Sequence, residues 1–237
     1  MRSAWAARLW KLEVRVPPPQ LSSQRFLFPE LLVAAAILAA GFAGMLPFSA
    51  TPFLFVFGVC SLWLRGEPAR AVGLAFRADW RRTVLVGAGA GIGYQGFSLY
   101  VVEPALARLT GKLPDVSLFA PLAGNVHFLL VALAVAWSFA ACGEEFVYRG
   151  FLLRRIAQAL GDGPGAWRSA LVATSVLFGV GHGYQGLSGM ITAGLGGFAF
   201  GLLYLASRRN LWVSVIAHGT MDTVGFLLLF LGRYPGS

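Results

Sequence analysis

The sequence predicts an all-α fold, a polytopic transmembrane helical bundle of about seven spanning helices. The first observation is composition: 57% of the residues are hydrophobic and 12% are charged, whereas soluble domains carry roughly 25% charged residues. The second is that several apolar runs are long enough to cross a hydrocarbon core of about 30 Å. The third is that the basic residues behind the net charge of +9 cluster between those runs. Such clusters are typical of topology signals, so we expect a lipid bilayer as partner and no nucleic acid.

The chain begins with residues 1–27, which we expect to form a basic cytoplasmic N-terminal arm. This segment holds five basic residues against one acid, and Pro17, Pro18 and Pro19 interrupt it. A signal peptide would have a shorter basic region, so an uncleaved first helix is the preferred interpretation. The apolar runs then predict spanning helices at 28–46, 48–64, 83–102, 122–148, 169–183, 187–206 and 211–231, with the fourth helical to about residue 160.

The orientation follows from three basic loops, at 65–82, 154–168 and 208–209. All three fall on the N-terminal side when seven helices are counted, so the positive-inside rule predicts a cytoplasmic N-terminus. The opposite loops hold few charges, and there we expect Glu103 and Asp115 to be solvated.

Acids and imidazoles lie inside the apolar runs, where each costs a few kcal/mol unless it has partners, water or a function. At about 1.5 Å per helical residue, the polar groups of three helices lie ~14 to 21 Å from the nearest basic residue of the cytoplasmic loops. The three helices therefore bring these groups to a similar depth, which predicts one buried aqueous pocket. The residues are Glu144, Glu145, His182, His218 and Asp222.

Spacing along the helices assigns local roles. Glu145 precedes Arg149 by four residues, the favoured orientation for a helical ion pair, so we expect a structural pair that leaves Glu144 for chemistry. His218 and Asp222 also stand four residues apart on one face, so the carboxylate can hold the imidazole in one orientation.

Three motifs carry a family resemblance. Glu144-Glu145-Phe-Val-Tyr-Arg149 resembles the EExxxR signature of the CAAX protease and bacteriocin-processing (CPBP, or Abi) family. Phe178-Gly-Val-Gly-His182 is similar to its FxxxH motif, and His218-Gly-Thr-Met-Asp222 to its HxxxN or HxxxD motif.

The resemblance covers about residues 144–222 and implies an intramembrane endopeptidase with a catalytic core at 122–232, behind N-terminal transmembrane helices at 28–121. It implies as many as eight helices, Glu144 as catalytic base, and His182, His218 and Asp222 completing the site. Arg149, Glu145 and Phe178 would support them. The expected location is a bacterial inner membrane, and the expected substrate is a membrane-associated protein or peptide.

Two mechanisms fit these residues. In the preferred one, Glu144 activates water, His182 or His218 stabilises the oxyanion, Asp222 orients His218, and no cofactor is required. In the alternative, Zn²⁺ is held by His182, His218, Asp222 and Glu144, and a bound water is the nucleophile. The sequence has no HExxH motif to favour zinc.

Three other functions fit parts of the sequence. Gly186-Leu-Ser188-Gly189 resembles the GxSG of rhomboid serine proteases, which would pair Ser188 with His218. A membrane transporter or proton-relay protein would spread its polar residues along the membrane normal. A catalytically silent membrane scaffold or immunity protein would keep the same fold without the activity.

Overall fold

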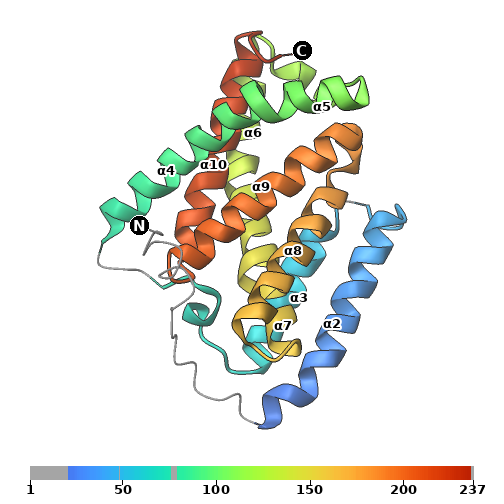
Figure 1. Ribbon diagram of the computed structural model, residues 1–237, viewed down its shortest axis with the longest axis vertical. Helices are drawn as coiled ribbons and strands as arrows, with labels where there is room; N and C mark the ends of the chain where they lie inside the picture. Colours follow the sequence, from blue (N-terminus) through green and yellow to red (C-terminus); the bar gives the residue numbers. More distant parts are fainter. Residues whose placement is uncertain (1–20, 48, 76–78, 236–237) are drawn as a thin grey trace, which may run out of the picture.

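The computed structural model describes residues 21–47, 49–75 and 79–235, and all regular structure in these ranges is helical, which confirms the predicted all-α fold. The helices form one elongated bundle (Figure 1). The longer helices are α2 (Leu21–Phe42), α3 (Ala50–Leu64), α4 (Trp80–Phe97), α5 (Glu103–Thr110), α6 (Val126–Val135), α7 (Leu153–Ala159), α8 (Pro164–Gly181), α9 (Gly186–Ala206) and α10 (Leu211–Phe230). Short 3-10 turns are η1 (Ala69–Val72), η3 (Ser117–Leu122) and η6 (Gly183–Gln185), and π-helical turns are η2 (Ser98–Val102), η4 (Ala136–Glu144) and η5 (Phe146–Leu152).

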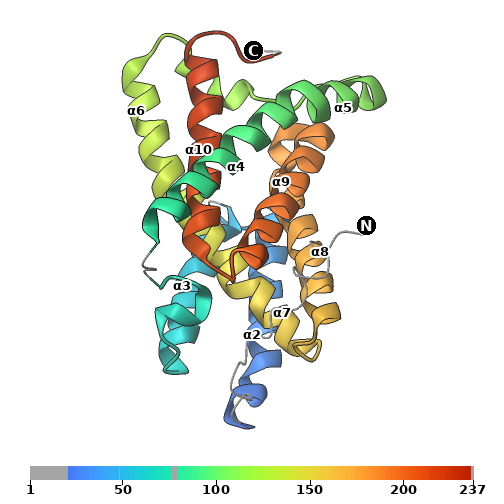
Figure 2. The same ribbon diagram turned by 60° about the vertical axis from the view of Figure 1, so that its left-hand side comes forward.

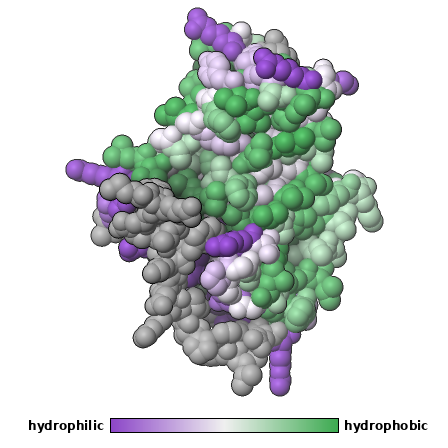
Figure 3. All heavy atoms as spheres, in the orientation of Figure 1, coloured by the Kyte–Doolittle hydropathy of each residue, from purple (hydrophilic) through white to green (hydrophobic). Residues whose placement is uncertain are grey.

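Five helical segments of the described residues are long and apolar enough to cross a membrane, which confirms a polytopic bundle. α3 is shorter, at 15 residues, and α8 is not among the five. Figure 3 shows hydrophobic side chains over much of the visible face, and Leu32, Trp63 and Tyr100 are among the large ones exposed. An apolar surface of this extent matches a surrounding of lipid. The five segments are Arg25–Phe42, Trp80–Thr110, Val126–Ala159, Gly183–Ala206 and Leu211–Phe230.

Two helix boundaries in the structure differ from those predicted from the sequence. α2 begins at Leu21, inside the segment predicted as the basic arm, and residues 1–20 of that arm lie outside the described residues. The third predicted helix does not end at residue 102 but continues to Thr110. The π-turn η2 ends at Val102, two residues before Pro104. Because proline has no N–H, it leaves a carbonyl of the preceding turn without its usual helical donor, and a wider turn accommodates this change.

Glycines allow two pairs of helices to approach closely. α4 packs along α10 and α8 along α9, the two most extensive helix contacts of the described residues. A Cβ added at Gly91 of α4 would overlap the carbonyl oxygen of Ala217 in α10, and one at Gly179 of α8 would overlap that of Met190 in α9. These contacts are the small-residue packing expected between helices in lipid. They hold α10 against α4 and α8 against α9.

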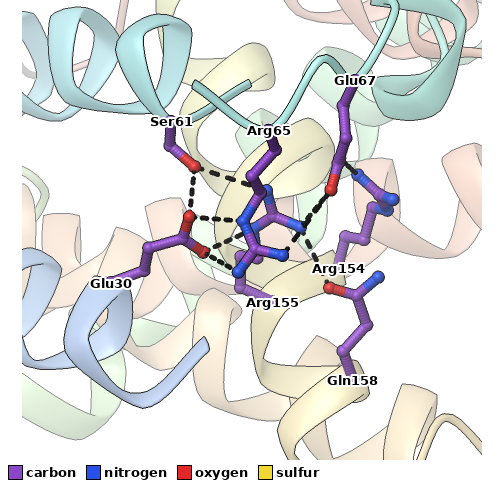
Figure 4. A network of polar contacts seen from close by, with 7 residues as sticks. All are labelled: Glu30, Ser61, Arg65, Glu67, Arg154, Arg155 and Gln158. Atoms are coloured by element: carbon purple, nitrogen blue, oxygen red, sulfur yellow. Dashed lines mark hydrogen bonds and ion pairs between the residues drawn. The ribbon is translucent and has the colours of Figure 1, made fainter. Parts of the chain in front are cut away.

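A polar network joins α2, α3 and α7 (Figure 4). Glu30 of α2 forms ion pairs with Arg65 Nε, 2.6 Å from its Oε1, and with Arg155 Nε, 3.0 Å from its Oε2. Glu67 binds Arg154 and accepts a hydrogen bond of 3.1 Å from Arg155 Nη1. Burial raises the pKa of Glu67, but the charges of Arg155 and Arg154 outweigh it, and the net pKa lies below its ordinary value. Arg155 is buried, so part of the basic loop predicted from sequence is a tertiary anchor.

The longest helix, Val126–Ala159, supplies both glutamates of the first motif. Its 34 residues would extend ~51 Å, more than the ~30 Å of a hydrocarbon core, so one end projects beyond the lipid tails. Figures 1 and 2 show the α7 end of this helix beside α2 and away from the C-terminus. The middle of the helix is π-helical on both sides of Glu145. Such turns change the angular spacing of side chains and are frequent at functional sites.

Candidate active site

The two adjacent glutamates occupy different environments. The Glu145 side chain is completely buried, whereas 19% of the Glu144 side chain remains accessible. Glu144 ends the π-turn η4, and Glu145 stands between η4 and η5. The first glutamate of the motif therefore remains partly accessible, and the second belongs to the interior.

Glu145 is the centre of a buried polar cluster. Arg149 Nη1 donates to its Oε1 over 2.8 Å, so the ion pair expected from the four-residue spacing is present. Arg149 Nη2 also donates to the carbonyl oxygen of Gly197 in α9, over 3.0 Å. His218 Nδ1 lies 2.9 Å from the same Oε1 of Glu145. Because a carboxylate only accepts, Nδ1 carries the proton, which fixes the ring and turns Nε2 toward the opposite side.

Two carboxylates face His218 Nε2. Glu144 Oε2 lies 4.0 Å from this nitrogen and Asp222 Oδ2 lies 3.6 Å from it. Both distances exceed that of a direct hydrogen bond, and catalytic contacts in unliganded sites are often this long. From the sequence we expected Asp222 to orient His218. In the structure Glu145 holds Nδ1, and Asp222 shares the Nε2 side with Glu144.

His182 ends α8 and faces the same cluster through Phe178. Its Nδ1 lies 2.8 Å from the carbonyl oxygen of Phe178, so Nδ1 donates and Nε2 is left for another contact. The Phe178 ring centroid lies 4.7 Å from that of His182 and 6.0 Å from that of His218. The guanidinium of Arg149 stacks over the same ring at 4.7 Å. Phe178 thus contacts both imidazoles and packs on the guanidinium of the Glu145–Arg149 ion pair.

The structure brings two tyrosines, Tyr184 and Tyr148, to this site. Tyr184 is 53% exposed, and its ring centroid lies 5.8 Å from that of His182. Its hydroxyl is within electrostatic reach of Glu144 and Asp222. Tyr148 is buried against Phe178, with the centroids 5.0 Å apart. The available signal was proximity in sequence: Tyr184 follows His182 by two residues at a helix end.

The rhomboid-like alternative does not assemble. The buried Ser188 hydroxyl donates to the carbonyl oxygen of Lys112 over 2.7 Å and lies 2.8 Å from Thr110 Oγ1. His218 is held by Glu145. Ser188 therefore anchors the start of α9 to the 110–112 turn, and the described residues contain no hydrogen bond between Ser188 and His218.

For a metal, the relevant candidates are His182, His218, Asp222 and Glu144. Among the residues that the structure describes, no group of three or more His, Cys, Asp or Glu side chains has the arrangement of a metal site. Metal dependence stays a prediction, which metal analysis tests. Cys142 and Cys60 are free thiols.

Comparison with known proteins gives a family match. A family model described as type II CAAX prenyl endopeptidase, Rce1-like, matches residues 126–224. No curated protein and no solved structure matches the chain. The matched residues run from the start of α6 into α10 and contain all three motifs. Residues 126–224 of this chain therefore resemble the CAAX protease family of intramembrane endopeptidases, and its long apolar helices are those of an integral membrane protein.

Proposed function

We propose that this endopeptidase cleaves a membrane-associated protein or peptide with Glu144 as the base that activates water. The observation that supports this role most directly is the environment of His218. Its Nδ1 is held 2.9 Å from buried Glu145, and its Nε2 faces the partly accessible Glu144 carboxylate at 4.0 Å. A carboxylate that water can reach, beside an imidazole held in one orientation, is what general-base hydrolysis requires.

The proposed reaction has two steps. Glu144 first removes a proton from water, and the water oxygen bonds to the scissile carbonyl carbon. The carbonyl oxygen becomes an oxyanion, which His182 or His218 stabilises from Nε2 when that nitrogen carries a proton in addition to the one on Nδ1. The C–N bond then breaks, and Glu144 returns the proton to the leaving nitrogen. Asp222, 3.6 Å from His218 Nε2, keeps that side of the ring oriented toward the reacting groups.

Substrate and orientation are part of the proposal. A prenylated CAAX-type peptide is the first substrate to test, because the matching family is described as a prenyl endopeptidase. We place the chain in a bacterial inner membrane with a cytoplasmic N-terminus. The arginines of the network at the α7 end, together with Arg208 and Arg209 between α9 and α10, support this orientation by the positive-inside rule.

The test is cleavage by the purified full-length protein in detergent. The substrates are a fluorogenic peptide library and its prenylated members, and the variants are Glu144→Gln and His182→Ala. We expect at least ~100-fold slower cleavage for each variant, the usual effect of removing a general base or a transition-state contact. Asp115→Asn is the matched control, because it makes the same carboxylate-to-amide change at an exposed outer residue. Wild-type rates in the Glu144 variant would refute the assigned base.

Metal content is measured on the same preparation. We expect cleavage to survive strong chelators and no zinc to co-purify in stoichiometric amount. Stoichiometric zinc that disappears in His218→Ala would replace the preferred mechanism with the metal-assisted one.

The transporter interpretation is less well supported. A proton relay needs acidic groups at successive depths, whereas Glu144 and Asp222 both face one nitrogen of His218. A catalytically silent scaffold would show no cleavage in the library assay.

A further inference from the structure

A second buried carboxylate lies far along the chain from the catalytic motifs. From the sequence we expected Glu103 to be solvated in an outer loop, and this expectation is wrong, since only 2% of the residue is exposed. The helix that begins at Trp80 continues past it to Thr110. Glu103 follows the π-turn η2 and faces the segment after α10, so α4, α5 and the C-terminal segment together enclose it.

Hydrogen-bond donors converge on this carboxylate. Ser98 Oγ donates to Glu103 Oε1 over 2.9 Å, and the Tyr234 hydroxyl donates to the same oxygen over 3.2 Å. The Gln95 side chain is hydrogen-bonded to Tyr234 in turn. The other oxygen, Oε2, is shielded from solvent and has no hydrogen-bond partner among the described residues. No ion pair with Glu103 occurs in the part of the chain that the structure describes.

This arrangement fits an ionised carboxylate that lacks a counter-charge. Donors that point toward a carboxylate stabilise its charged form. The Ser98 and Tyr234 hydroxyls satisfy Oε1, whereas Oε2 is out of water and has no donor among the described residues. An ionised carboxylate held out of water without a cation is unfavourable. A positive charge next to Oε2 removes that cost.

We propose that Glu103, Ser98 and Tyr234 form a binding site for a hard monovalent cation such as Na⁺. Carboxylate, hydroxyl and carbonyl oxygens are the ligands that hard cations prefer. Pro104 leaves a carbonyl of the preceding turn without a helical donor, which offers one more oxygen. A single carboxylate matches one positive charge, whereas Ca²⁺ sites usually contain several acids.

The position of the site defines its effect. Its ligands come from η2, from α5 and from the segment after α10. A bound cation would therefore tie the C-terminal segment to the α4–α5 helix, and it would stabilise the folded protein by binding it in preference to the unfolded chain. The site contains no residue of the proposed catalytic cluster, so its effect on stability is separable from cleavage.

The experiment is thermal unfolding of the full-length protein in detergent, followed by tryptophan fluorescence. NaCl, KCl and choline chloride are compared at equal ionic strength, which holds general screening constant. In wild type we expect Tm to be about 3 °C higher in saturating Na⁺ or K⁺ than in choline. In Glu103→Gln, which keeps the shape of the side chain, the three salts should give one Tm. Asp115→Asn should keep the wild-type response.

Two results would overturn the site: the same wild-type Tm in all three salts, or a cation response that persists in Glu103→Gln. Where Glu103→Gln does not fold, Tyr234→Phe and Ser98→Ala each remove one proposed oxygen ligand and leave the carboxylate. Both should need a higher cation concentration for half of the Tm shift. An unchanged midpoint in both variants would also contradict the proposal.

Discussion

At the residue scale, adjacent glutamates separate into a chemical and an architectural role. Glu144 keeps an accessible carboxylate, while Glu145 is completely buried between Arg149 and His218. The sequence identified the ion pair from the four-residue spacing, but it gave no sign that the same carboxylate holds His218, which lies 73 residues away. Contacts of that separation depend on how α10 packs against the long helix, and a local pattern carries no information about them.

The two glutamates should respond differently to the same substitution. Glu145→Gln breaks a buried ion pair and leaves Arg149 uncompensated, which typically costs about 3 kcal/mol or more, equivalent to a Tm lower by roughly 6 to 12 °C in a chain of this size. Glu144→Gln should abolish cleavage with Tm nearly unchanged, because its side chain is partly solvated. Thermal unfolding and peptide cleavage of both variants check this. Equal Tm values would show that the Arg149 contact contributes little.

At the element scale, close helix approach depends on particular glycines rather than on glycine content. α4 contains several glycines, and the sequence alone does not say which of them touch a neighbour. A Cβ at Gly91 would overlap α10, whereas a Cβ at Gly93 has open space within 4 Å. Since α10 carries His218 and Asp222, the position of the catalytic side chains depends on this contact.

This difference gives a matched pair of substitutions. Gly91→Ala should force α4 away from α10 at a cost of about 1 to 3 kcal/mol, as overpacking usually does, and should slow cleavage. Gly93→Ala should be neutral or stabilise by up to ~1 kcal/mol, because alanine favours a helix. Thermal unfolding of both variants, with cleavage rates, decides the matter. A loss of stability at Gly93 equal to that at Gly91 would contradict the assigned packing.

Neither the π-turns nor the burial of Glu103 could be predicted from the sequence, and the physical reason is the same for both. Apolar runs predict where a helix crosses lipid, and they did so for the segments that contain the first and third motifs, whereas α8, which carries the second, is not among the five long apolar segments. They do not show where a helix changes its turn or continues past its apolar part. The helix from Trp80 extends to Thr110 through η2, so an acid predicted in a loop became part of the interior.

At the scale of the whole molecule, the network around Arg155 connects the N-terminal helices to the catalytic helix. Glu30 comes from α2, Ser61 from α3, and Arg155 and Gln158 from α7. Arg155 Nη2 also donates to Ser61 Oγ over 3.3 Å. The sequence placed these arginines at the cytoplasmic side, but it could not show that they pair with acids from segments more than 80 residues away.

This network predicts a pH dependence of stability. Burial raises the pKa of Glu67, yet Arg155 and Arg154 lower it further, so the folded pKa lies below the ordinary value of 4.5. The stabilisation is therefore present above that value and is lost as pH falls through the folded pKa. The Tm of wild type should fall more steeply below about pH 4.5 than that of Glu67→Gln. Equal slopes of Tm against pH for the two proteins would contradict this role of Glu67.

The family match begins at residue 126, whereas both acids that neutralise Arg155 precede it. Excised from the rest of the chain, the matched segment would keep its three motifs and the contact of Arg155 with Gln158, but the guanidinium would lose both carboxylates where α2 and α3 now pack. An autonomous protease fragment must accordingly start upstream of Glu30.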